Sequence, residues 1–129
     1  MSHDADTPEQ FQAMLQKADK SVVDFHATWC GPCRAIAPYV VSECAAKGAN
    51  LIKVDVDKNG VIASKYGIQA MPTFKVIDKS GNVIFEKVGG GQGNVNEVIA
   101  KAIWWSWTQH YQLIQTTYHL KNQQPNFPQ

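Results

Sequence analysis

Apolar and polar positions along the first half of the chain predict two helices and two strands. Thr7-Pro8-Glu9-Gln10 combines a capping threonine with a proline in the first turn, which predicts a helix to about Ala18. Ser21 to Ala27 alternates and is rich in Val and Phe, which is typical of a strand. A second helix is predicted to follow Cys30 and to run to about Lys47, and a buried strand is predicted from Leu51 to Val56.

The second half predicts a short helix, two strands and a last helix. Asn59 to Tyr66 forms the short helix, and the strands Thr73 to Ile77 and Val83 to Val88 are joined by Lys79-Ser80-Gly81-Asn82. The last helix follows Asn94. After the first helix, the predicted order is β-α-β-α-β-β-α, which is an α/β arrangement. The 129 residues fit a single domain and a tail.

The motif Trp29-Cys30-Gly31-Pro32-Cys33 lies where the first strand gives way to the second helix. Two intervening residues in a first helical turn let two sulfurs come close enough to form a disulfide. The unpaired N–H groups and partial positive charge of a helix start favour a thiolate, so Cys30 is predicted to be the nucleophile. Cys33 lies one turn further in, where burial raises the pKa of a thiol, and is predicted to be the resolving thiol.

The same cysteine spacing can supply half of a zinc site, which needs a second pair of ligands. The remaining residues that could complete such a site lie scattered along the chain without finger-like spacing: Cys44, His3, His26, His110 and His119. The sequence therefore favours a redox dithiol over a metal site, and no metal is expected.

The motif and its surroundings resemble the thioredoxin family from about Thr7 to Ile103. The resemblance rests on separated segments in the same order: Val22-Val23-Asp24-Phe25, Ala27 to Cys33, Pro38, Lys53 to Asp57, Tyr66-Gly67-Ile68, Met71-Pro72-Thr73-Phe74 and Lys87-Val88-Gly89. It implies a thioredoxin fold, a central mixed β-sheet flanked by α-helices in a single domain over residues 1–103. The family has a further strand before its first helix, but six mostly polar residues precede Thr7, so this edge strand is expected to be short or missing.

The resemblance also implies a cis peptide bond at Met71-Pro72 that faces the cysteines. The Met71 backbone would then be free to pair with an extended substrate segment by strand addition. A flat apolar docking surface is implied for the positions that match the family: Trp29, Gly31, Pro32, Met71, Pro72, Val88, Gly89 and Gly90. The alternative for Trp29 is a core aromatic, and for the glycines it is a flexible connection.

Asp24 is a carboxylate within an otherwise apolar strand, where burial would raise its pKa. The resemblance implies that Asp24 accepts the proton of Cys33 through a bridging water, and that Lys53 pairs with this carboxylate. The alternatives are a strand-end aspartate that reaches solvent and a solvated lysine at a strand edge. His26 shares a strand face with Asp24 by alternation and could tune its titration, or it is an ordinary half-exposed histidine.

Pro32 indicates the direction of the chemistry, because proline offers the thiolate neither a donor nor a charge and so favours the disulfide form of the motif. We predict a reductant of protein disulfides that binds no cofactor, with electrons from NADPH through thioredoxin reductase implied by the resemblance. The alternative is a thioredoxin-like binding module in a larger assembly. A glutathione-linked glutaredoxin is a third reading, but no glutathione site is evident.

The formal net charge of +1 and the lack of a basic run give no reason to expect nucleic acid or membrane partners. Residues Met1 to Asp6 are polar and acidic, unlike the charged start and apolar stretch typical of a signal peptide, and two of the three cysteines belong to the redox motif. A reducing cytoplasmic location is therefore expected.

Residues 104–129 depart from the family pattern as a C-terminal extension. An apolar stripe at helical spacing predicts a helix over 104–118: Trp104, Trp107, Tyr111, Ile114 and Tyr118. A disordered tail is expected from Asn122 to Gln129. The stripe could fold back on the domain, join two chains as a homodimer, or be an extension without function.

Overall fold

The computed structural model describes residues 2–103, and its centre is a four-stranded mixed sheet. The strands are β1 (Lys20–His26), β2 (Asn50–Asp55), β3 (Thr73–Asp78) and β4 (Val83–Val88), arranged in the order β2-β1-β3-β4. β1 runs parallel to β2 and antiparallel to β3, and β3 is antiparallel to β4. The predicted central mixed sheet is therefore confirmed.

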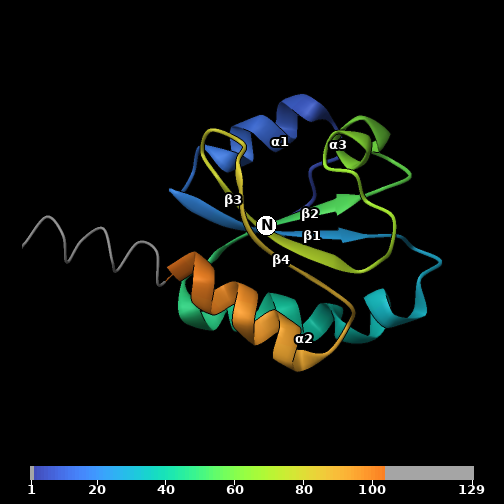
Figure 1. The fold of residues 1–129 in the computed structure, drawn as a ribbon, viewed down its shortest axis with the longest axis vertical. Helices are drawn as coiled ribbons and strands as arrows, with labels where there is room; N and C mark the ends of the chain where they lie inside the picture. Colours follow the sequence, from blue (N-terminus) through green and yellow to red (C-terminus); the bar gives the residue numbers. More distant parts are fainter. Residues whose placement is uncertain (1, 104–129) are drawn as a thin grey trace, which may run out of the picture.

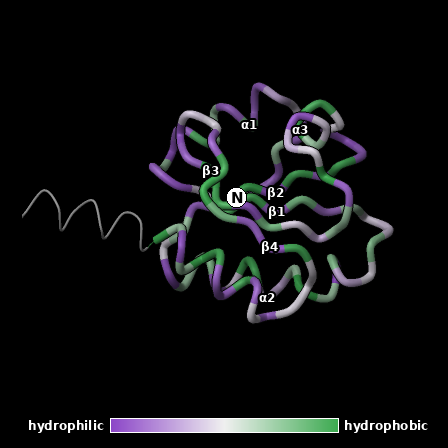
Figure 2. Tube along the Cα trace, viewed as in Figure 1, coloured by the Kyte–Doolittle hydropathy of each residue, from purple (hydrophilic) through white to green (hydrophobic). Residues whose placement is uncertain are grey.

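Helices cover both faces of this sheet, as Figure 1 shows. α1 (Pro8–Leu15) and α3 (Gly60–Lys65) lie on one face, and α2 (Gly31–Lys47) lies on the other beside a helical segment at residues 92–103. Because successive strand residues point to opposite faces, Val22 packs toward α2 whereas Val23 packs toward α1. The apolar residues of the inner strands lie between the two helix layers (Figure 2). Among the described helices, none combines the length and apolar character needed to cross a membrane.

The element order is the predicted one, but most of the predicted boundaries are shifted by one to three residues. α1 ends at Leu15 instead of about Ala18, because Leu15 is its last buried residue and Gln16 already caps the helix. β1 starts at Lys20, one residue early, where it pairs with Asp78 of β3. The last helix starts at residue 92 and not after Asn94.

The expected edge strand is reduced to a single bridge beside β2. Asp4 and Lys53 form an isolated parallel bridge, in which Ala5 N–H donates to the Lys53 carbonyl at 2.8 Å and Lys53 N–H donates to the His3 carbonyl at 2.7 Å. The short pairing follows from Thr7, which caps α1 only three residues after Asp4. The predicted helix over 104–118, the disordered tail and the dimer contact all lie outside the described residues.

Candidate active site

The two cysteines of the motif form a disulfide at the start of α2, with their Cα atoms 5.3 Å apart. β1 ends at His26, and Cys30 is the N-cap of α2 in an extended conformation. The N–H of Cys33 points at the Sγ of Cys30, 3.2 Å away. Both cysteines are at least 94% buried, with 6% of Cys30 and 5% of Cys33 exposed. In the reduced protein this N–H and the helix start favour negative charge on the Cys30 sulfur.

Three loops meet around Cys30 and form a surface that we call the docking surface. It consists of Trp29, Gly31, Pro32, Met71, Pro72, Val88, Gly89 and Gly90. The Cys30 Sγ lies 3.7 Å from the carbonyl oxygen of Met71, which precedes the cis peptide bond to Pro72. The structure thus brings together the three loops to which the sequence assigned substrate contact.

Backbone contacts hold the third of these loops against the other two. The N–H of Gly89 donates to the Pro72 carbonyl at 2.9 Å, and Thr73 lies opposite Val88 in the sheet. At Gly90 an added Cβ would lie 3.3 Å from the carbonyl oxygen of Pro32, so a side chain there would press on the loop between the cysteines. A glycine at this position therefore allows close approach of the two loops.

Trp29 follows the end of β1 and lies exposed on the docking surface. Its side chain is 64% exposed, and its Nε1–H donates to Asp57 Oδ2 at 2.9 Å. This excludes the core-aromatic interpretation of Trp29. Asp57 was missed as a site residue from the sequence, although a signal exists: β1 and β2 are parallel, so the residues that follow them meet at one edge of the sheet.

Asp24 lies in the middle of β1 and is 2% exposed, which excludes the strand-end interpretation. Its register partners are Lys53 on β2 and Phe74 on β3. Burial raises the pKa of Asp24 from 3.8 to about 7, and the positive charge of Lys53 acts in the opposite direction. Among the described residues, Oδ1 of Asp24 has no hydrogen-bond partner. Lys53 thus acts on Asp24 through its charge.

Asp24 and Cys33 line one pocket of about 190 Å³. Its lining includes Asp24, His26, Cys33, Arg34 and Lys53. Buried polar atoms such as Asp24 Oδ1 are commonly satisfied by ordered water, and the pocket is large enough for water beside Cys33. This arrangement fits a carboxylate that exchanges a proton with Cys33.

The remaining cysteine, Cys44, is a buried packing residue of α2. It is 2% exposed within the core between the sheet and α2, and burial raises the pKa of its thiol to about 12. Within residues 2–103, no group of three or more His, Cys, Asp or Glu is arranged to hold a metal ion.

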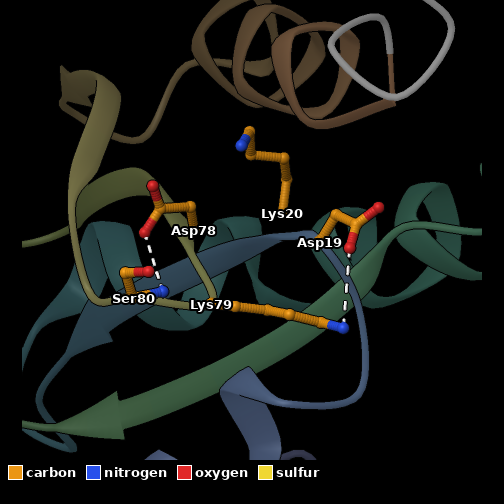
Figure 3. Close-up of a pocket in the computed structure, with 5 residues that line it drawn as sticks. All are labelled: Asp19, Lys20, Asp78, Lys79 and Ser80. Carbon is orange, nitrogen blue, oxygen red and sulfur yellow. Dashed lines mark hydrogen bonds and ion pairs between the residues drawn. The ribbon is translucent and has the colours of Figure 1, made fainter. Parts of the chain in front are cut away.

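A second polar pocket, of about 230 Å³, lies at the start of β1, at the other end of that strand from the cysteines (Figure 3). Asp78 Oδ1 accepts the N–H of Ser80 at 2.9 Å, and Lys79 lies 3.6 Å from Asp19. These contacts hold the turn between β3 and β4, so we assign this pocket to the fold and not to the redox site.

The disulfide lies at the start of a helix, beside a cis-proline loop and after the C-terminal end of an inner strand of a mixed sheet. This arrangement defines a dithiol–disulfide oxidoreductase. Comparison with known proteins agrees with this class. The sequence model of the thioredoxin family matches residues 3–103. Thioredoxin H1 of Arabidopsis thaliana is 44% identical over 101 residues, which cover 74% of this chain and 87% of the relative. Thioredoxin Asp f 28 of Aspergillus fumigatus is 45% identical over 100 residues, covering 76% and 90%.

Solved structures give the same result. Reduced thioredoxin from Schistosoma mansoni superimposes with a TM-score of 0.70 at 38% identity, covering 77% of this chain and 95% of that one. Plasmodium falciparum thioredoxin gives a TM-score of 0.71 at 31% identity, covering 76% and 96%. The chain belongs to the thioredoxin family. It is a thiol–disulfide oxidoreductase with the thioredoxin fold, and it reduces protein disulfides by cycling the Cys30–Cys33 pair between dithiol and disulfide.

Proposed function

We propose that the two cysteines divide the reduction of a substrate disulfide between them. The Cys30 thiolate attacks the substrate and forms a mixed disulfide, and Cys33 then attacks Cys30 and releases the reduced substrate. The observation that supports this division best is the N–H of Cys33, which points at the Cys30 sulfur, while Cys33 itself borders the pocket of Asp24. Cys30 is thus favoured as a thiolate at the start of α2, and Cys33 lies beside a base.

In this cycle Asp24 accepts the proton of Cys33 through water as Cys33 becomes the attacking thiolate. A pKa of about 7, raised by burial, suits a group that takes up and releases a proton near neutral pH. Lys53 keeps that pKa from rising further through its positive charge. Both roles rest on the placement of these side chains around one pocket.

The docking surface receives an extended segment of the substrate protein. The Met71 carbonyl beside Cys30 is available as a hydrogen-bond acceptor for the substrate backbone, and Trp29 and Val88, which is 58% exposed, supply apolar contact. The partners are therefore proteins with accessible disulfides, together with thioredoxin reductase, which returns electrons from NADPH. A reducing compartment such as the cytoplasm suits this electron transport, because the dithiol must be regenerated after each turnover.

The proposed cycle is tested by insulin reduction with NADPH and thioredoxin reductase. We expect turnover by the intact chain and by Cys44→Ala, which removes the cysteine outside the motif. Cys33→Ser should lose turnover and accumulate a mixed disulfide, which peptide mass analysis should place on Cys30. A mixed disulfide on any other cysteine would refute the assignment. No turnover by the intact, reduced chain would favour the binding module.

We also propose that residues 1–103 form the redox domain and that 104–129 are a separate extension. Contact of this extension with a second chain is a prediction from its aromatic stripe alone. Light scattering on the full chain and on a chain ending at Ile103 tests this point, and a monomer mass for both would rule out the dimer.

A further inference from the structure

The pocket beside Cys33 contains a second buried polar atom that the proposed cycle does not use. Asp24 Oδ1 and His26 Nε2 are the two buried side-chain atoms that lack a hydrogen-bond partner within the described part of the chain. Both residues line the same pocket. They are separated by one residue on β1, which places their side chains on the same face of the sheet.

The position of His26 is suited to proton transfer between this pocket and solvent. The residue as a whole is half-buried, and its Nε2 is buried within the pocket lining. A neutral imidazole can accept a proton at one nitrogen and release a proton from the other. The pocket volume of about 190 Å³ accommodates several waters at roughly 30 Å³ each, enough to join Asp24 to His26.

We infer that His26 is a positioning residue for the redox reaction, which passes the proton of Asp24 to solvent through water in this pocket. The inference rests on the proposed role of Asp24. Cys33 gives its proton to the Asp24 carboxylate, and its thiolate attacks the Cys30 sulfur of the mixed disulfide. The Cys30–Cys33 bond forms as the bond to the substrate sulfur breaks, and the substrate thiolate leaves with the electron pair. The proton then moves from Asp24 to His26 and to water.

The surroundings of His26 favour its neutral form, which has a nitrogen lone pair that can take up a proton. Burial, and after it the positive charge of Lys53, lowers the pKa of His26. Asp55 and Asp4 act in the opposite direction, and Lys58 adds to the lowering. Asp55 is already engaged, since its Oδ1 accepts the N–H groups of Asp57 and Lys58. The other titratable groups that line the pocket are Asp24, Cys33, Arg34 and Lys53.

The test separates the two sulfur exchanges in time. Reduced protein is mixed with Ellman's reagent, an aromatic disulfide that releases a coloured thiolate, in a stopped-flow instrument between pH 5.5 and 8.5. The first thiolate reports attack by Cys30, and the second reports attack by Cys33 on the mixed disulfide. Because the aromatic thiolate leaves easily, deprotonation of Cys33 should limit the second phase. The variants are His26→Gln, His26→Ala and, as a matched control, His3→Gln, which removes a histidine that does not line the pocket.

We expect the second phase of His26→Gln to slow about three- to tenfold at pH 7, less than the full loss of an acid–base group, with the first phase unchanged. His26→Ala should slow similarly and recover when imidazole is added, which a purely structural role would not allow. The control should match the native protein. Equal second-phase rates and pH profiles for His26→Gln and the native protein, or no recovery with imidazole, would overturn the inference. Release of a single thiolate by the native protein would refute the proposed cycle, and this inference with it.

Discussion

Replacing Asp24 with asparagine should stabilise the folded protein above about pH 8, and the stability of the variant relative to the native protein should grow as the pH rises. Asp24 is 2% exposed, and burial raises its pKa from 3.8 to about 7. Between these two values the folded protein holds a proton that the unfolded chain has released. Because the folded state then binds more protons, the free energy of unfolding falls as the pH rises.

The magnitude follows from this difference in pKa. Each tenfold change in proton affinity corresponds to about 1.4 kcal/mol. Ionised Asp24 therefore lowers the free energy of unfolding by about 4 kcal/mol above pH 8, and most of this decrease occurs as the pH rises from 4 to 7. Asparagine has nearly the same shape and does not titrate. Its unpaired amide costs about 1–3 kcal/mol, but this cost does not change with pH. The stability difference between variant and native protein should therefore increase by about 3 kcal/mol from pH 4.5 to pH 8.5.

The assay is urea unfolding of both proteins in their oxidised form at constant ionic strength. The other titrating groups are common to both proteins and cancel in the difference. Asp19→Asn removes a carboxylate whose side chain is 61% exposed, and should change the stability by less than about 0.5 kcal/mol. If the stability difference between Asp24→Asn and the native protein is the same at pH 4.5 and pH 8.5, the reasoning about the buried carboxylate is refuted.

Three further predictions address the glycine loop, the third cysteine and a half-buried ion pair. Gly89 has a φ of +114°, so Gly89→Ala should cost about 1–3 kcal/mol in urea unfolding, whereas Gly91→Ala, where an added Cβ meets nothing within 4 Å, should cost less. Iodoacetamide should leave Cys44 unmodified in the native, reduced protein, because the thiol is buried and burial raises its pKa to about 12. Labelling of Cys44 found by mass mapping would contradict its burial. Glu86→Gln should lower the free energy of unfolding by about 1–3 kcal/mol, because it leaves the charge of Lys75 buried and unpaired. Lys75→Met leaves an exposed carboxylate and should lower it less. Equal losses of stability in the two variants would show that burial of the lysine is unimportant.

The parts of the site that could be predicted from the sequence are those set by local rules. A cysteine at the N-cap followed by glycine and proline predicts where α2 starts, and the structure places that start at Gly31. Alternation along β1 predicts that Asp24 and His26 share a face, and both line one pocket. The boundaries of α1 and the last helix were less accurate, because helix ends depend on which residues the rest of the protein buries.

Contacts between distant segments could not be derived from local rules. No spacing in the sequence indicates that Gly90 packs on Pro32 or that Trp29 donates to Asp57. The family resemblance supplied the docking surface as a set of positions, but the bond from Gly89 to Pro72 that holds two of its loops together required the structure. Such contacts depend on the sheet order, which brings β4 to β3 and the end of β2 to the end of β1.

The two cysteines share one disulfide and one helix, and their proposed roles differ because they face different surroundings. The Cys30 sulfur lies beside the Met71 carbonyl and accepts the N–H of Cys33, so a charge there is stabilised by the backbone without a titrating side chain. Cys33 lies on the other side, against the pocket that contains Asp24. A carboxylate with an ordinary pKa would be too weak a base for a thiol. Burial raises the pKa of Asp24 to about 7 and also makes the folded protein with ionised Asp24 less stable. The same desolvation therefore lowers the stability of the protein and would suit Asp24 to its proposed role as base in the resolving step.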